Sequence, residues 1–197
     1  MTTVTEAERP ASPPAHTHSH SHVPPALTHW RVWLTRHPIA GAALVGTMAT
    51  WVATIFGFWL GGIGLPQLNW PIANGSVVLA KSSAAVQFSA GEFIHGIDGI
   101  VFTMIFVVFI YPLLGRSRSP VANMARGIFF GMVLATLSAG FLVPYVYYPH
   151  AGAGIFGSGY GWKVVFAIYL WHLVFGVNLG MLYNPLKADD PALAPTH

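Results

Sequence analysis

The feature that most constrains this chain is a series of four long apolar segments, at residues 39–63, 92–114, 125–147 and 162–183. Each is close to the roughly 20 residues that a helix needs to cross the hydrocarbon core of a bilayer. None carries the polar stripe expected of a helix on the surface of a soluble protein. Charged residues make up only 8% of the chain, against about 25% in ordinary soluble domains. We therefore predict an all-α fold, an integral membrane four-helix bundle.

The distribution of Lys and Arg predicts the orientation of these spans. With the N-terminus inside, the inner side carries seven basic residues and the outer side carries two, Lys81 and Lys163. An excess of basic residues marks the cytoplasmic side of membrane proteins. We therefore predict a multi-pass protein of the bacterial inner (cytoplasmic) membrane with both termini cytoplasmic. No basic run suits nucleic acid, so the expected partners are membrane lipids and other integral membrane subunits.

The two ends of the chain differ from its apolar body. Residues 1–29 are rich in histidine and proline and show no helical period, which predicts a disordered N-terminal tail. We expect the transmembrane domain at residues 30–186 and a short C-terminal tail at residues 187–197. In the first tail, "HTHSHSH" alternates histidine with Ser or Thr, and such tracts bind divalent metals loosely. The candidate metal ligands there are His16, His18, His20 and His22; the alternative is a tail with incidental affinity.

Small residues four apart occur in every predicted span. Lipid offers no hydrophobic drive for helices to pair, so close backbone approach at small residues takes over that role. The residues concerned are Ala42, Gly46, Thr50 and Thr54 in the first span, Gly91, Gly99 and Thr103 at the second, Gly127, Gly131, Ala135 and Ala139 in the third, and Gly176 and Gly180 in the fourth. The connection at residues 64–91 is moderately apolar and has room for a short helix.

Two acidic residues, Glu92 and Asp98, lie within the apolar body and flank His95 at three-residue spacing. Three-residue spacing brings neighbours onto a shared side of a helix. His172 lies at a depth in the fourth span similar to that of Asp98. An ionisable group at such depth is costly and usually faces the protein interior with a partner. We therefore expect a buried polar cluster of His95, Asp98 and His172, with a hydrogen bond between Asp98 and His172.

Three interpretations of this cluster stay open. It can be a polar clasp that fixes the register of the helices. It can bind a metal ion or haem, with Glu92, His95, Asp98 and His172, and in addition His150, as candidate ligands for a mixed nitrogen and oxygen site. It can also line a proton or small-ligand path that opens to the outer face. The Glu-x-x-His spacing of di-iron bundles needs a second copy, which this sequence lacks.

Four short motifs carry a resemblance to a known group: "GIGLPQLNWP" after the first span, then "FIHGIDGIVF", "RGIFFG" and "WHLVFGVNLGMLY". Over about residues 38–184 the chain resembles an uncharacterised family of small four-helix prokaryotic integral membrane proteins, a domain of unknown function. The resemblance implies the four-helix fold and carries no activity with it.

The sequence contains no nucleophile elbow, P-loop or dinucleotide fingerprint, so we expect no enzymatic activity. Because there are no cysteines, disulfides, thiolate metal sites and iron–sulfur clusters are excluded. We expect a non-catalytic accessory or structural subunit of a larger bacterial membrane complex, a respiratory or other redox assembly. The alternatives are a metal- or haem-binding membrane protein that uses the His/Asp cluster, and a small proton-coupled transporter or channel.

Overall fold

A computed structural model of the chain describes residues 25–115, 119–149, 152 and 154–194, and these residues form helices and loops with no strand. Four helices are long and apolar enough to cross a membrane: Pro38–Ile63, Ala84–Leu113, Pro120–Tyr147 and Trp162–Leu182. The prediction of an all-helical fold with four apolar helices of membrane-spanning length is confirmed. The histidine tract at residues 16–22 and His150 lie outside the described residues.

Three of the spans are built from more than one kind of helix. The first joins α2 (Pro38–Trp59) to the 3₁₀ turn η1 (Leu60–Ile63). The second joins α4 (Ala84–Ile105), the wider π-helical stretch η2 (Phe106–Ile110) and α5 (Tyr111–Leu113). The third joins α6 (Pro120–Leu137) to the π-helical stretch η3 (Ser138–Tyr147), and the fourth is α7 (Trp162–Leu182).

Shorter helices connect and flank these spans: α1 (Pro25–Arg36), α3 (Trp70–Val78), η4 (Ile155–Tyr160) and η5 (Pro191–Leu193). The structure corrects the predicted tail, because residues 25–29 already belong to α1. The indole nitrogen of Trp30 donates to the Leu182 carbonyl at 2.9 Å and Arg31 donates to the Asn184 carbonyl at 3.0 Å. These bonds tie α1 to the end of α7 and explain why it forms.

The second span starts at Ala84 rather than at residue 92, which is a second correction. Ser83 caps the helix by accepting a hydrogen bond from the Val86 nitrogen, and the alanines that follow favour helix. The span of 30 residues is about 45 Å long at 1.5 Å per residue, longer than a hydrocarbon core of about 30 Å. Asp98 therefore lies near the middle of its helix and not close to one end.

Small residues bring α2 and α4 into close antiparallel contact. A Cβ on Gly46 would lie 2.9 Å from the Thr103 hydroxyl, and a Cβ on Gly99 would collide with the Thr50 side chain. Only glycine allows the two backbones to approach this closely. The prediction that Gly46, Gly99 and Thr103 lie at helix contacts is confirmed.

Close backbone contact at glycines also joins α6 to α7. A Cβ on Gly127 would lie 2.7 Å from the Gly180 Cα, and a Cβ on Gly131 would lie 3.2 Å from the Gly176 Cα. Two pairs of glycines thus face each other one turn apart along antiparallel helices. All four were among the small residues predicted to pack.

The short helix α3 lies between the first two spans and packs along α4. Asn69 caps it by accepting a hydrogen bond from the Ile72 nitrogen at 3.0 Å, and Pro71 in the first turn suits a helix start. Its first residue, Trp70, is buried, and its ring centroid lies 6.2 Å from that of Trp171 on α7. The start of α3 therefore reaches into the bundle.

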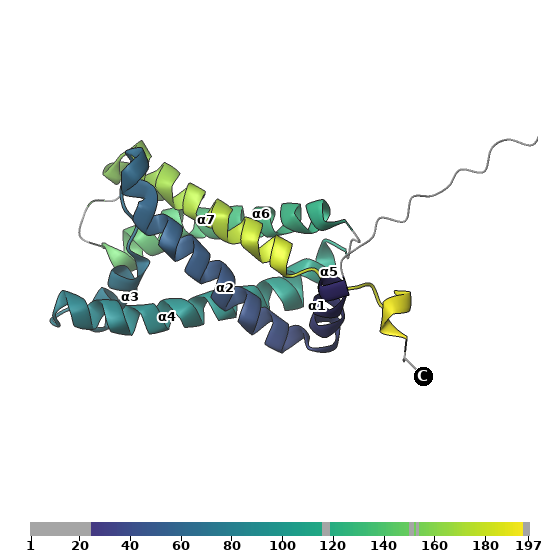
Figure 1. Cartoon of the computed structure of the whole chain (residues 1–197). Coiled ribbons are helices and arrows are strands. Elements are labelled where there is room, and N and C mark those ends of the chain that lie inside the picture. Colours follow the sequence, from purple (N-terminus) through teal and green to yellow (C-terminus); the bar gives the residue numbers. More distant parts are fainter. Residues whose placement is uncertain (1–24, 116–118, 150–151, 153, 195–197) are drawn as a thin grey trace, which may run out of the picture.

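The helices form two groups joined by α2. Figure 1 shows α6 and α7 along one side of the bundle and α4 along the other, with α2 crossing between them. α2 packs against both α4 and α7, whereas α4 makes little direct contact with α6 or α7. α1 and η5 lie at the same end of the bundle. The membrane side that this end faces stays a prediction.

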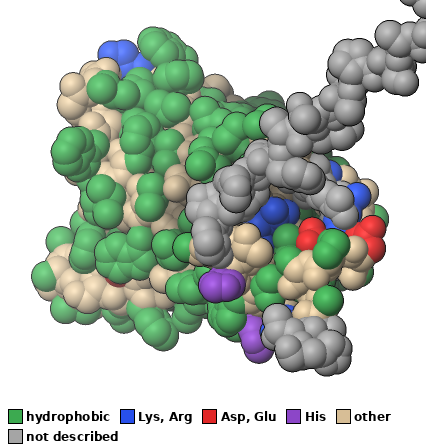
Figure 2. Space-filling model, turned by 45° about the vertical axis from the view of Figure 1, so that its right-hand side comes forward, with side chains coloured by type: hydrophobic (Ala, Val, Ile, Leu, Met, Phe, Trp, Pro, Cys, Tyr) green, Lys and Arg blue, Asp and Glu red, His purple; other side chains and the backbone are tan. Residues whose placement is uncertain are grey.

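The surface of the bundle is apolar over most of its body. On the face drawn in Figure 2, hydrophobic side chains cover the middle, while Lys, Arg, Asp and Glu gather mainly towards the ends. Large side chains such as Trp59, Phe93 and Leu113 are exposed. Extended exposed apolar surface marks a region that meets lipid or a partner protein.

Replacing Gly91 with Ala should weaken the contact between α3 and α4. Its new Cβ would lie 2.6 Å from the Gly75 nitrogen, so the two backbones would have to separate. Overpacking of this kind costs about 1–3 kcal/mol, and we expect that loss in the free energy of unfolding measured in detergent.

Gly96→Ala is the matched control, because nothing lies within 4 Å of a Cβ at this position of the same helix and alanine favours helix more than glycine does. Equal stability of the Gly91→Ala and Gly96→Ala variants would contradict the described packing.

Candidate functional site

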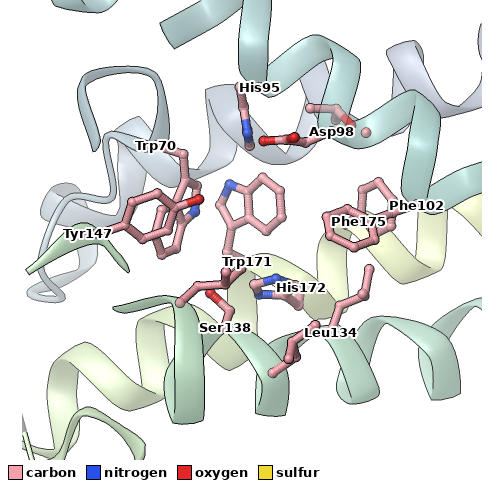
Figure 3. A pocket seen from close by; sticks show the side chains of 14 residues that line it. Trp70, His95, Asp98, Phe102, Leu134, Ser138, Tyr147, Trp171, His172 and Phe175 are labelled. Atoms are coloured by element: carbon pink, nitrogen blue, oxygen red, sulfur yellow. The ribbon is translucent and has the colours of Figure 1, made fainter. Parts of the chain in front are cut away.

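The residues of the expected polar cluster line one cavity. His95 and Asp98 reach it from α4 and His172 reaches it from α7 (Figure 3). Both histidines are buried, at 7% exposure each, and Asp98 is half-buried. Thr50 of α2 and Ser138 of η3 add two hydroxyl groups. The cavity is therefore polar on several sides although it lies between apolar helices.

Aromatic side chains form much of the remaining wall: Trp70 from α3, Phe102 from α4, Tyr147 from η3, and Trp171 and Phe175 from α7. The Trp171 and Phe175 rings are nearly parallel, with an interplanar angle of 4° and centroids 6.0 Å apart. Trp70 meets Trp171 edge-on. These rings shape the space into which the polar groups project.

The cavity lies about halfway along the spans. Asp98 is 14 residues beyond Ala84, where α4 starts, which is roughly 21 Å along the helix. His172 is 10 residues beyond Trp162, where α7 starts, or roughly 15 Å. Tyr147, the last residue of the third span, also lines the cavity, so the cavity extends from the middle of the spans towards the loop end of the bundle.

The cavity is small, and residues of both α4 and the third span line it. The space open to the centres of water molecules is about 60 Å³, room for roughly four to six waters at about 10–15 Å³ each. Phe102 of α4 and Leu137 and Leu142 of the third span are among its lining residues, and Leu137 is 43% exposed. Because Leu137 both lines the cavity and is exposed, we take these three apolar residues as the rim through which the cavity reaches the surface of the bundle.

Two hydrogen bonds of Thr54, one within α2 and one to α4, indicate which nitrogen of His95 carries the hydrogen. The Thr54 hydroxyl donates to the Thr50 carbonyl at 2.8 Å. Its oxygen lies 3.0 Å from His95 Nε2. Because its one hydrogen is donated to the carbonyl, we assign the hydroxyl as the acceptor there. His95 therefore carries a hydrogen on Nε2, and in the neutral ring Nδ1 keeps a lone pair.

His172 has the opposite arrangement. Its Nδ1 lies 2.8 Å from the Ile168 carbonyl oxygen, which can only accept, so Nδ1 carries the hydrogen. Nε2 of the neutral ring then keeps the lone pair. Within the described residues, neither His95 Nδ1 nor His172 Nε2 has a hydrogen-bond partner. Each histidine thus offers one free acceptor.

The expected hydrogen bond between Asp98 and His172 is wrong for this arrangement. Asp98 instead accepts from the side-chain amide of Asn74, on α3, at 3.4 Å. In Figure 3 the indole of Trp171 lies between His172 on one side and His95 and Asp98 on the other. Its ring centroid is 4.8 Å from that of His172 and 5.6 Å from that of His95. The prediction started the second span at residue 92 and not at Ala84, and so placed Asp98 too close to the start of its helix.

Three buried donors around the cavity have no partner among the described residues: Trp70 Nε1, Trp171 Nε1 and the Thr50 hydroxyl. The side chains are 7%, 5% and 2% exposed. Buried polar groups are almost always hydrogen-bonded. These residues were not predicted from the sequence, although Trp171 stands beside His172 and Trp70 follows the Asn69 cap.

The structure does not assemble the predicted metal site. Among the described residues, no group of three His, Asp or Glu side chains is placed to hold a metal ion. Glu92 does not line the cavity, because six residues turn a helix to a direction roughly 120° away from that of Asp98. The enclosed space is also too small for a porphyrin, so neither metal nor haem gains support.

A second cavity lies next to the first at the loop end of the bundle. Trp70 lines both, and Tyr148 and Tyr160 line the second. Burial raises the pKa of the Tyr148 hydroxyl, so this group stays protonated and neutral at pH 7. Trp70 therefore separates a space among the connecting loops from the central cavity.

Comparisons with known proteins return nothing: no protein-family model, curated protein or solved structure matches the chain. The resemblance to small four-helix prokaryotic membrane proteins therefore stays a prediction, and the site rests on its own geometry.

Proposed function

We propose that this protein binds the polar head of a small lipid-soluble molecule in its central cavity. The observation that carries the proposal is the set of unpartnered groups there: the Trp70 and Trp171 indole nitrogens, the Thr50 hydroxyl, and one free nitrogen on each of His95 and His172. A buried donor left without a partner costs about 1–3 kcal/mol. A bound molecule that supplies the partners recovers that cost.

The opening of the cavity supports entry from lipid. Its rim of Phe102, Leu137 and Leu142 lies between α4 and the third span, which pack little against each other. A molecule with an apolar tail can place its head among the polar groups and leave the tail between lipid chains. Such entry needs no aqueous path, and the third span offers few polar side chains for one.

Filling the rim should block binding. We expect an apolar molecule to copurify with the protein extracted from its own membrane, and Leu142→Trp to reduce its amount several-fold, because Leu142 lines the cavity. The measurement is mass spectrometry of solvent extracts of the purified protein.

Phe141→Trp is the control, because Phe141 is the adjacent residue, is 52% exposed and does not line the cavity. An equal amount of the molecule in both variants would show that it binds elsewhere.

A second proposal concerns partner subunits and is favoured by the outer side of α4. In the most apolar 18-residue stretch of this span, only 28% is buried inside the protein, against 44–50% in the corresponding stretches of the other three spans. This side includes Glu92, whose side chain is half-buried, and Gly96. A Cβ at Gly96 would meet nothing within 4 Å, so there is open space beside this residue. A carboxylate facing lipid is costly, and an open glycine suits close packing of a further helix.

These features support a non-catalytic accessory or structural subunit of a larger complex. The setting we propose is a respiratory or other redox assembly of the bacterial inner membrane, with both termini of this chain in the cytoplasm. The lipid-soluble ligand and the partner subunits are compatible, since the cavity opens beside α4 and not on its outer side.

Blocking the outer side of α4 should release the protein from such a complex. We expect a native mass well above that of one chain in mild detergent, and Gly96→Trp should lower it because the large ring fills the open space. Phe166→Trp, at an exposed position on α7, is the control. A single-chain mass for the unaltered protein would refute the proposal.

A further inference from the structure

The chemistry of the cavity indicates the kind of head that it binds. Building on the proposed function, we infer that the ligand is a quinone or hydroquinone, a six-membered ring with oxygen substituents at opposite ends and an apolar tail. Binding of either form requires no electron transfer within this chain.

The polar groups of the cavity are of two kinds. Donors come from three residues that line the cavity, Trp70, Trp171 and Thr50, whose indole nitrogens and hydroxyl have no partner among the described residues. Acceptors come from Asp98 and from the free nitrogens of His95 and His172. A quinone carbonyl accepts from the first kind, and a hydroquinone hydroxyl both donates to the second kind and accepts from the first. One ring therefore gives partners to both sets.

Other common head groups satisfy the cavity less well. A carboxylate or phosphate would lie near the carboxyl group of Asp98 and meet like charge at a depth where charge is poorly screened. A quaternary ammonium would suit Asp98 and the aromatic walls, but it has nothing to accept from the Trp70 and Trp171 indoles. A plain alcohol provides one oxygen where the cavity offers groups on several sides.

The walls and the volume also fit a flat ring. Phe102, Trp171 and Phe175 line the cavity, and the last two lie nearly parallel. Aromatic faces and edges stack favourably on a further ring. Room for about four to six water molecules is comparable with one six-membered ring, so the tail must leave through the apolar rim.

The test uses the full chain purified into lipid nanodiscs and a benzoquinone with a decyl tail as the probe. Quinones quench indole fluorescence on contact, and Trp70 and Trp171 line the cavity. We expect saturable quenching beyond that seen for free tryptophan in empty nanodiscs. Thr50→Val, which removes one donor, should weaken binding about three- to tenfold.

The matched control is Thr47→Val on the same helix. Its hydroxyl bonds only to its own backbone, at the Ala43 carbonyl, and it does not line the cavity. Both changes keep the side-chain shape, but Thr50 also packs against Gly99 in the contact between α2 and α4. A difference in affinity between variants that unfold at the same temperature without the probe reports the lost donor at Thr50. Unsaturable quenching, or equal affinity of the two variants, would overturn the quinone assignment.

Decyltrimethylammonium and decanol serve as further probes, with binding followed by the rise in thermal unfolding temperature. If the ammonium probe binds the cavity and the quinone does not, the quinone assignment fails and the proposed lipid-soluble ligand stands. If none of the three probes binds, both the assignment and the proposed function fail.

Discussion

Polar groups in the middle of a membrane helix need partners. The two central histidines of this protein find them in a hydroxyl of the neighbouring helix α2 and in the backbone of α7. Thr54 donates to the carbonyl one turn earlier and so accepts from His95, while His172 donates to the Ile168 carbonyl. These two bonds use the hydrogen of each ring and leave its lone pair free. The chemistry of the cavity follows from this constraint, because the free nitrogens must be matched by something else.

Close glycine contacts decide where the cavity lies. They bind α2 to α4 and α6 to α7, so the four spans form two tight pairs. α2 packs against α7 between the pairs, and beyond α4 the second span also meets the third, where the Phe106 ring centroid lies 5.2 Å from that of Phe130 and the Tyr111 hydroxyl donates to Asn123. In the described part of the chain, α4 has no such glycine contact with the third span. The cavity there is lined by large rings of α7, such as Trp171 and Phe175. Irregular rings pack less completely than glycine stripes, and the remaining space opens towards the apolar surface.

The helical architecture could be predicted because it depends on local properties of the sequence. The length of the apolar segments predicted the four spans. The four-residue spacing of small residues predicted the helix contacts at Gly46, Gly99 and Gly127. The start of α4 was placed too late, because "SSAAVQFSAG" is only weakly apolar and its Ser83 cap acts through a hydrogen bond that hydropathy does not detect.

The site was predictable in part, and the missing part depends on tertiary contact. The unusual depth of His95, Asp98 and His172 singled them out, and they do share a cavity. The Asn74 partner of Asp98 comes from α3, and nothing in the sequence shows how deep that helix reaches. Nor does the π-helical start of η3, which brings Ser138 to the wall, leave a hydropathy signal.

The most direct test of this account is the position of the hydrogen on each central histidine. Nitrogen NMR of ¹⁵N-histidine-labelled protein in lipid bilayers distinguishes the two neutral tautomers, and His95→Gln and His172→Gln variants assign the signals among the 10 histidines. The account predicts hydrogen on Nε2 of His95 and on Nδ1 of His172. The same tautomer at both residues, or the two exchanged, would contradict it.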